Sequence, residues 1–114
     1  MIFKTIDLKE FKPTVELALY EVEKEIELAK ASNVFAIKVV HGYGSHGVGG
    51  TIFSALRQKL KNLKKQGKIY DFLNGEDWNI FNPKAKLVLE KCDMASLDSD
   101  LNKNNPGITV ILIK

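Results

Sequence analysis

Cysteine, histidine and long apolar runs are scarce in this sequence, and each shortage excludes a class of protein. Cys92 is the one cysteine among 114 residues, so an internal disulfide is excluded and we expect a reducing, cytoplasmic compartment. A lone thiol usually packs as a small apolar group, and we expect this of Cys92. Cysteine and histidine do not show the spacing of a zinc site. No run approaches ~18 consecutive apolar residues, and residues 1–10 lack the apolar core of a signal peptide, so we expect no membrane association.

The composition, 45% hydrophobic and 27% charged, is that of one globular domain spanning residues 1–114. The net charge of +3 is modest, but its distribution is uneven. The first predicted helix concentrates acids at Glu16, Glu21, Glu23, Glu25 and Glu27. A later run of basic residues contains no acid and comprises Arg57, Lys59, Lys61, Lys64, Lys65 and Lys68. We therefore expect one negative and one positive side of the molecule.

Hydrophobic periodicity predicts alternating strands and helices. We expect strands at residues 2–8, 34–40, 68–73 and 107–113, and helices at 13–31, 51–66 and 82–91, with Gly67 as the stop of the second helix. The strand at 34–40 is almost continuously apolar and is predicted to be central and buried on both faces. This order predicts an α/β fold: a two-layer sandwich with a mixed four-stranded sheet, two main helices and an extra short helix in the last connection.

A glycine-rich turn links the buried strand to the second main helix and contains five of the eight glycines. Glycines allow close approach of a ligand to the backbone, and the first N–H groups of a helix have no partner within the helix. A phosphate therefore suits this turn. The candidate phosphate-binding residues are Gly42, Tyr43, Gly44, Ser45, His46, Gly47, Gly49, Gly50 and Thr51. The alternative interpretation is a flexible connector.

Two nucleotide-binding motifs partly fit the same turn. Residues 42–47 match G-x-G-x-x-G, with Asp71 where a ribose-binding acid falls, but too little chain follows to complete a dinucleotide-binding fold. Residues 44–51 are similar to a P-loop, yet Gly50 occupies the place of the phosphate-binding lysine. We therefore do not expect a nucleotide triphosphatase.

The sequence resembles the small MutS-related (Smr) domain family. The resemblance depends on His41-Gly42-Tyr43-Gly44, which fits the H-G-x-G motif of the family, on Ile6-Asp7-Leu8 in the first strand, and on Gly107-Ile108-Thr109-Val110, which is similar to its closing G-x-T-V pattern. The family implies an α/β sandwich similar to the C-terminal domain of translation initiation factor three. It also implies DNA or RNA binding and, in several members, endonuclease activity.

The chain departs from the family pattern in two places. The first family motif is L-D-x-H-G, whereas this chain has Lys9 at the position of the histidine. That change counts against cleavage but not against phosphate binding. If the protein is an endonuclease, Asp7 and His41 are the catalytic candidates, with Mg²⁺ or Mn²⁺ as cofactor. The alternative interpretation of His41, which the sequence leaves equally open, is a hydrogen bond to the loop. Residues 74–106 are longer than the usual connection and are interpreted as an insertion.

Several other side chains are weaker candidates. Lys9, Arg57, Lys61, Lys64 and Lys65 are expected to contact a nucleic-acid backbone. Two carboxylate clusters have the oxygen ligands that Mg²⁺ prefers, namely Glu76 with Asp77 and Asp98 with Asp100, but solvated loop acids are the favoured interpretation. Tyr43, Trp78 and Phe81 suit base stacking, although Trp78 and Phe81 are expected instead to pin the long loop.

Three functional hypotheses remain open on the sequence. The first is a nucleic-acid-binding module that grips phosphates through the glycine-rich turn and the basic helix and needs no cofactor. The second is a metal-assisted endonuclease of Smr type. The third is a protein-interaction domain without enzymatic activity, whose acidic first helix meets a basic partner.

Overall fold

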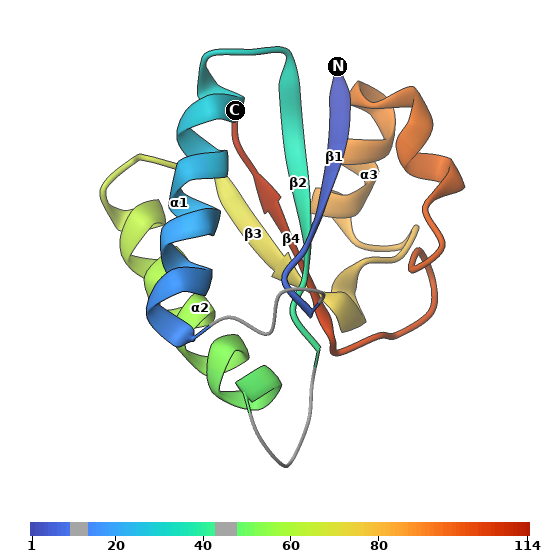
Figure 1. The fold of residues 1–114 in the computed structure, drawn as a ribbon. Coiled ribbons are helices and arrows are strands. Elements are labelled where there is room, and N and C mark those ends of the chain that lie inside the picture. Colours follow the sequence, from blue (N-terminus) through green and yellow to red (C-terminus); the bar gives the residue numbers. More distant parts are fainter. Residues whose placement is uncertain (10–13, 43–47) are drawn as a thin grey trace.

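Strands and helices alternate along the chain as predicted, up to the last connection (Figure 1). The computed structural model describes residues 1–9, 14–42 and 48–114, and for 48–51 it describes the backbone alone. The strands are β1 (Ile2–Asp7), β2 (Val34–Val40), β3 (Asp71–Asn74) and β4 (Ile108–Leu112). The helices are α1 (Val15–Lys30), α2 (Val48–Lys65) and α3 (Pro83–Lys91), with 3₁₀ segments η2 (Gly75–Asp77) and η3 (Asp93–Leu97). In the described part of the chain no helix is both long and apolar enough to cross a membrane.

The strands form one mixed sheet in the order β1-β2-β4-β3. β1 and β2 are parallel, whereas β4 pairs antiparallel with both β2 and β3. The carboxyl ends of β1, β2 and β3 therefore meet at one edge of the sheet, together with the start of β4. The mixed four-stranded α/β fold is confirmed.

Helices α1 and α2 cover one face of the sheet (Figure 1). Buried residues recur every three or four positions along α1, at Ala18, Val22, Ile26 and Ala29, which is the spacing of one helix face. Thr14 caps this helix by accepting a hydrogen bond from the N–H of Leu17 at 3.2 Å. This face of the sheet therefore carries the larger of the two cores.

The other face is covered by α3 and η3, which belong to the predicted insertion (Figure 1). Trp78, Val88 and Cys92 are fully buried there, so the expected packing role of Cys92 is confirmed. With helices on both faces, six of the seven residues of β2 are buried, as the apolar run predicted. The sequence did not predict that the extra helix would cover the second face. That residues 74–106 are an insertion stays a prediction.

A buried ion cluster fastens this second layer to the sheet. The Lys38 ammonium lies 2.7 Å from a carboxylate oxygen of both Asp98 and Asp100. Asp98 also accepts a hydrogen bond from Nε1 of Trp78 at 2.9 Å. The interpretation of these two acids as solvated loop residues or as metal ligands is therefore wrong, because they neutralise a lysine on the central strand. Trp78 pins the loop as predicted, whereas Phe81 is 82% exposed and does not.

Two elements begin three residues away from their predicted starts. α2 begins at Val48, inside the predicted loop, and β3 begins at Asp71 rather than at residue 68. The chain leaves α2 through Gly67 at φ 73°, with the N–H of Lys68 bonded to the carbonyl of Leu63 and that of Gly67 to Lys64. This paired pattern is a Schellman motif, which confirms Gly67 as the stop and keeps the next residues out of the sheet.

Candidate functional site

The residues of the H-G-x-G and G-x-T-V patterns meet at the carboxyl edge of the sheet. The backbone N–H groups of His41 and Gly42 both donate to the carbonyl of Gly107 at 3.0 Å. Gly42 has φ 78°, a conformation that favours glycine. A Cβ on Gly107 would lie 3.3 Å from Cα of Gly42, so the two backbones approach closely. The beginning of the glycine-rich turn is therefore anchored to the start of β4.

The His41 ring completes this connection and is 2% exposed. Nδ1 lies 2.7 Å from the carbonyl oxygen of Gly42 and must donate to it, because a carbonyl only accepts. Nε2 lies 2.9 Å from Oγ1 of Thr109. Burial lowers the pKa of His41, so the ring is neutral and Nε2 accepts from the hydroxyl. Both ring nitrogens are thus occupied by protein atoms.

Asp7 lies at the same edge as His41, as predicted from the ends of two parallel strands. It is in register with Val40 on the neighbouring strand. Its carboxylate accepts a hydrogen bond from the N–H of Lys9 at 2.9 Å. In the described part of the chain, no hydrogen bond joins Asp7 to His41. The edge therefore assembles the two candidates without linking them as an acid–base pair.

Lys9 occupies the position at which the family pattern has a histidine, and it lies against the glycine-rich turn. A Cβ on Gly42 would be 3.5 Å from Cδ of Lys9, so the lysine stem passes over this glycine. The side chain of Lys9 is exposed. A cation at this place suits a phosphate held at the turn.

Most of the predicted phosphate-binding residues lie outside the described residues. These are Tyr43, Gly44, Ser45, His46 and Gly47. Gly49, Gly50 and Thr51 lie in the first turn of α2, where backbone N–H groups lack helical partners and the helix dipole favours an anion. Gly42 is described, but its N–H is already bonded to Gly107. The anion site at the turn therefore stays a prediction that rests on the start of α2.

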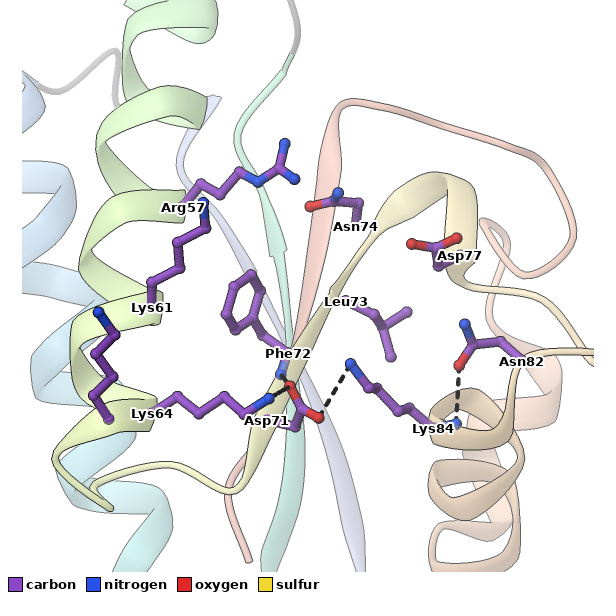
Figure 2. Close-up of a pocket in the computed structure, with 11 residues that line it drawn as sticks. Arg57, Lys61, Lys64, Asp71, Phe72, Leu73, Asn74, Asp77, Asn82 and Lys84 are labelled. Atoms are coloured by element: carbon purple, nitrogen blue, oxygen red, sulfur yellow. Dashed lines mark hydrogen bonds and ion pairs between the residues drawn. The ribbon is translucent and has the colours of Figure 1, made fainter.

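The basic face of α2 borders a cavity of about 610 Å³ beside the outer strand β3 (Figure 2). α2 forms one wall, β3 the floor, and the start of α3 the opposite wall (Figure 2). Five cationic side chains line it: Arg57, Lys61, Lys64, Lys65 and Lys84. Two carboxylates, Asp71 and Asp77, also line it, so the wall carries an excess of positive charge. We call this feature the β3-edge groove.

Asp71 neutralises two of the five cations. Its oxygens lie 3.0 Å from Nζ of Lys64 and 3.1 Å from Nζ of Lys84. Burial raises the pKa of Asp71, but a hydrogen bond from the N–H of Phe72 and the two lysines outweigh it, so the pKa lies below its ordinary value. Arg57, Lys61 and Lys65 have no carboxylate partner among the described residues. These three cations are the part of the predicted basic helix that remains available to a ligand.

Glu76 and Asp77 lie on η2, just after β3. β2 and β4 separate β3 from β1, so at the usual strand spacing the ends of β1 and β3 are about 14 Å apart. The structure thus does not bring these acids together with Asp7 and His41. In the ranges that the structure describes, no group of three or more histidine, cysteine, aspartate or glutamate side chains is placed to hold a metal.

The acidic face of α1 is largely neutralised by lysines. Ion pairs join Glu25 to Lys4, Glu21 to Lys24, Glu27 to Lys30 and Glu23 to Lys59. This pairing also removes Lys59 from the free cations of α2. A basic protein partner would therefore meet fewer free carboxylates on α1 than the sequence suggested.

Five residues of the β3-edge groove were not candidates in the sequence analysis, namely Phe72, Leu73, Asn74, Asn82 and Lys84. Each lies on or directly beside an element whose position next to α2 depends on the strand order. The signal in the sequence was weak, since Phe72 belongs to a predicted strand and Lys84 to a predicted helix with many lysines.

Comparisons with known proteins agree with this geometry. No curated protein matches the chain at a significant level. Among solved structures, the chain is similar to the Smr domain of Thermus thermophilus MutS2, with a TM-score of 0.61, 22% sequence identity, and coverage of 97% of this chain and 98% of that chain. At this identity the likeness shows the fold alone. The Smr domain family model matches residues 6–76, which is more than half of the chain. The protein therefore belongs to the Smr domain family.

Proposed function

We propose that this protein binds nucleic acid through the sugar-phosphate backbone, using the basic face of α2 together with the start of that helix and Lys9. The Smr domain family is associated with nucleic-acid binding and, in several members, with nuclease activity. The observation that carries the proposal for this chain is the row of Arg57, Lys61 and Lys65. These cations line the β3-edge groove and have no acidic partner in the described part of the chain.

The spacing of this row suits a phosphate backbone. Residues four apart lie on one helix face and are separated by about 6 Å along the axis, so the row spans about 12 Å. One strand of a nucleic acid presents a negative charge about every 3.4 Å of helix axis, so several successive phosphates fall within this reach. Contacts of this kind neutralise charge without reading bases, and we expect little sequence preference.

The start of α2 extends the positive field toward the carboxyl edge of the sheet. Its first turn contains no acid, and its last turn contains Lys64 and Lys65. Lys9 lies against Gly42 at the same edge. A strand that follows α2 would therefore meet positive charge from the glycine-rich turn to the end of the helix.

The endonuclease alternative has less support, because His41 already uses both ring nitrogens within the protein. A general base needs a free nitrogen within reach of the proton it abstracts. Incubation of the protein with DNA and RNA in the presence of Mg²⁺ or Mn²⁺ tests cleavage directly. Activity that is lost in His41→Ala, with the fold retained, would favour this alternative.

The binding proposal is tested with two matched variants. The groove triple replaces Arg57, Lys61 and Lys65 with glutamine. The control triple makes the same charge change at exposed lysines outside the groove, namely Lys86, Lys91 and Lys103. Affinity for fluorescently labelled DNA and RNA is measured by anisotropy at low salt.

We expect the groove triple to bind roughly tenfold or more weakly and the control triple to lose much less, because local phosphate contacts exceed the effect of net charge alone. Equal losses in both triples would show that binding depends on net charge and not on the groove, which would contradict the proposed binding surface. Absence of binding by the unmodified protein at low ionic strength would refute the proposal.

A further inference from the structure

The floor of the β3-edge groove carries an aromatic ring among cations. Phe72 lies on the outer strand β3 and is only partly buried against the core under α1 and α2. Figure 2 shows its ring in the gap between α2 and β3, beside Lys61. An aromatic face in a positively charged groove is the arrangement on which unpaired bases stack.

A second side chain of the groove has unused hydrogen-bonding capacity. The amide of Asn74 makes no hydrogen bond to another described residue. Figure 2 shows it at the mouth of the groove, pointing toward the side on which Arg57 lies. An amide both donates and accepts, so it can pair with the edge of a base. Asn82, in contrast, already caps α3 by accepting from the N–H groups of Lys84 and Ala85.

Charges within the groove are arranged asymmetrically. The three unpaired cations all lie on α2, whereas Asp71 and Asp77 lie on the side of β3 and η2. A ligand with one anionic and one neutral, planar half would place its anionic half against α2. Its planar half would then lie over Phe72, on the side of the row that faces β3. A nucleotide has these two halves.

The size of the groove sets how much ligand it can enclose. Its volume of about 610 Å³ falls within the range for small-molecule sites, roughly 300–1,000 Å³. This space suits a single nucleotide but not a duplex, whose bases are stacked and paired inside. A duplex would contact α2 through its phosphates alone and leave Phe72 and Asn74 unused.

We propose that the β3-edge groove receives one unpaired nucleotide of a single strand, with the base on Phe72, its edge at Asn74, and the flanking phosphates on Arg57, Lys61 and Lys65. The inference rests on the proposed function and narrows it to single-stranded or locally unpaired nucleic acid. DNA and RNA share this chemistry, and both are used as probes below.

The test compares a single strand of roughly ten nucleotides with a blunt-ended duplex in which the same strand is paired with its complement. Phe72→Leu removes the ring and keeps an apolar side chain toward the core, and Asn74→Ala removes the amide. Matched controls lie outside the groove: Phe81→Leu at a ring that is 82% exposed, and Asn62→Ala on an exposed part of α2. Thermal unfolding confirms that each variant is folded.

We expect the unmodified protein to bind the single strand about tenfold more tightly than the blunt-ended duplex. Phe72→Leu should weaken single-strand binding about fivefold and Asn74→Ala about threefold, with duplex binding and both control variants unchanged. If Phe72→Leu does not fold, Asn74→Ala still carries the test, because the Asn74 side chain makes no hydrogen bond to another described residue.

The outcomes separate the two proposals. Equal affinity for single strand and blunt-ended duplex, with no effect of Phe72→Leu or Asn74→Ala, would overturn the unpaired-nucleotide site. If the groove triple still weakened binding in that case, the proposed function would stand. Absence of binding to either probe would overturn the proposed function itself.

Discussion

Nε2 of His41 accepts a hydrogen bond from Oγ1 of Thr109 at 2.9 Å, across 68 positions of the chain. This bond joins the residue that follows β2 to the second residue of β4, directly beside the shared carbonyl of Gly107. The histidine of the H-G-x-G pattern and the threonine of the G-x-T-V pattern are thus two halves of one contact. In this protein His41 is a positioning residue that holds the glycine-rich turn at the sheet edge.

The first prediction concerns this contact. Thr109→Val keeps the shape of the side chain but removes the hydroxyl, which leaves Nε2 of buried His41 without a partner. An unsatisfied buried acceptor costs about 1–3 kcal/mol of unfolding free energy. Urea unfolding measures the loss. Thr5→Val, at an exposed position of β1, is the matched control and should change stability little. Equal stability of Thr109→Val and the unmodified protein would contradict this role of His41.

The second prediction concerns the buried ion cluster. Lys38→Met leaves the carboxylates of Asp98 and Asp100, which are 8% and 20% exposed, without their cation. Removal of one partner from a buried ion pair costs about 3–5 kcal/mol. Lys4→Met, which breaks the more exposed pair with Glu25, should cost at most about 1 kcal/mol. Denaturant unfolding of both variants checks the contrast, and similar losses would show that the cluster does not fasten the second layer.

The third prediction is a dependence of stability on pH. Burial raises the pKa of Asp100, but hydrogen bonds with Lys38 and Asn105 outweigh it and bring the pKa below its ordinary value of 3.8. The folded carboxyl therefore binds protons less readily than the unfolded one, so its stabilisation is full above about pH 5 and is lost as pH falls through the folded pKa. Asp71 acts in the same direction.

His41 also contributes to the loss of stability as pH falls, and its contribution begins at a higher pH than that of Asp100. Burial lowers its pKa below 6.5, so the unfolded state takes up the proton first and stability begins to fall below about pH 6.5. Thermal melts from pH 7 to pH 3 should show both losses. Asp100→Asn should reduce the loss of stability below about pH 5 and leave the loss above that pH unchanged. An unchanged loss below about pH 5 in that variant would rule out Asp100 as its source.

The fourth prediction concerns Gly75, the first residue of η2. A Cβ at this position would lie 1.6 Å from the carbonyl oxygen of Asn105 and 2.8 Å from Cγ1 of Ile108. Gly75→Ala must therefore displace backbone, at a cost of about 1–3 kcal/mol or more. Gly67→Ala faces open space at φ 73° and should cost about 1–2 kcal/mol from conformation alone. Chemical denaturation ranks the two, and a milder effect at Gly75 would contradict the packing.

Local sequence patterns were sufficient to predict the buried strand β2, the helix α1 and the end of α2. The apolar run of β2, the helical spacing of α1 and the stop at Gly67 depend on neighbours in sequence, and each prediction is confirmed. The ion cluster of Lys38 was missed because its partners lie 60 and 62 residues away. A lysine within an otherwise apolar central strand was the available signal.

The candidate site was predicted less completely, for the same reason. The basic residues of α2 stand together in the sequence and were identified, but the pairing of Lys64 with Asp71 and Lys59 with Glu23 is tertiary. Phe72 and Asn74 acquire their place only because β3 lies at the free edge of the sheet beside α2. Strand order cannot be deduced from the hydrophobic pattern, so the groove that depends on this order could not be predicted.

The most direct test of the central claim is the salt dependence of nucleic-acid affinity in the unmodified protein and the groove triple. Affinity falls with salt, and each lysine or arginine that neutralises a phosphate makes the slope of log affinity against log salt steeper by about 0.7 for a single strand. The account predicts that replacement of Arg57, Lys61 and Lys65 makes the slope shallower by about 2, whereas the control triple keeps the slope of the unmodified protein. Identical slopes for the unmodified protein and the groove triple would contradict the account.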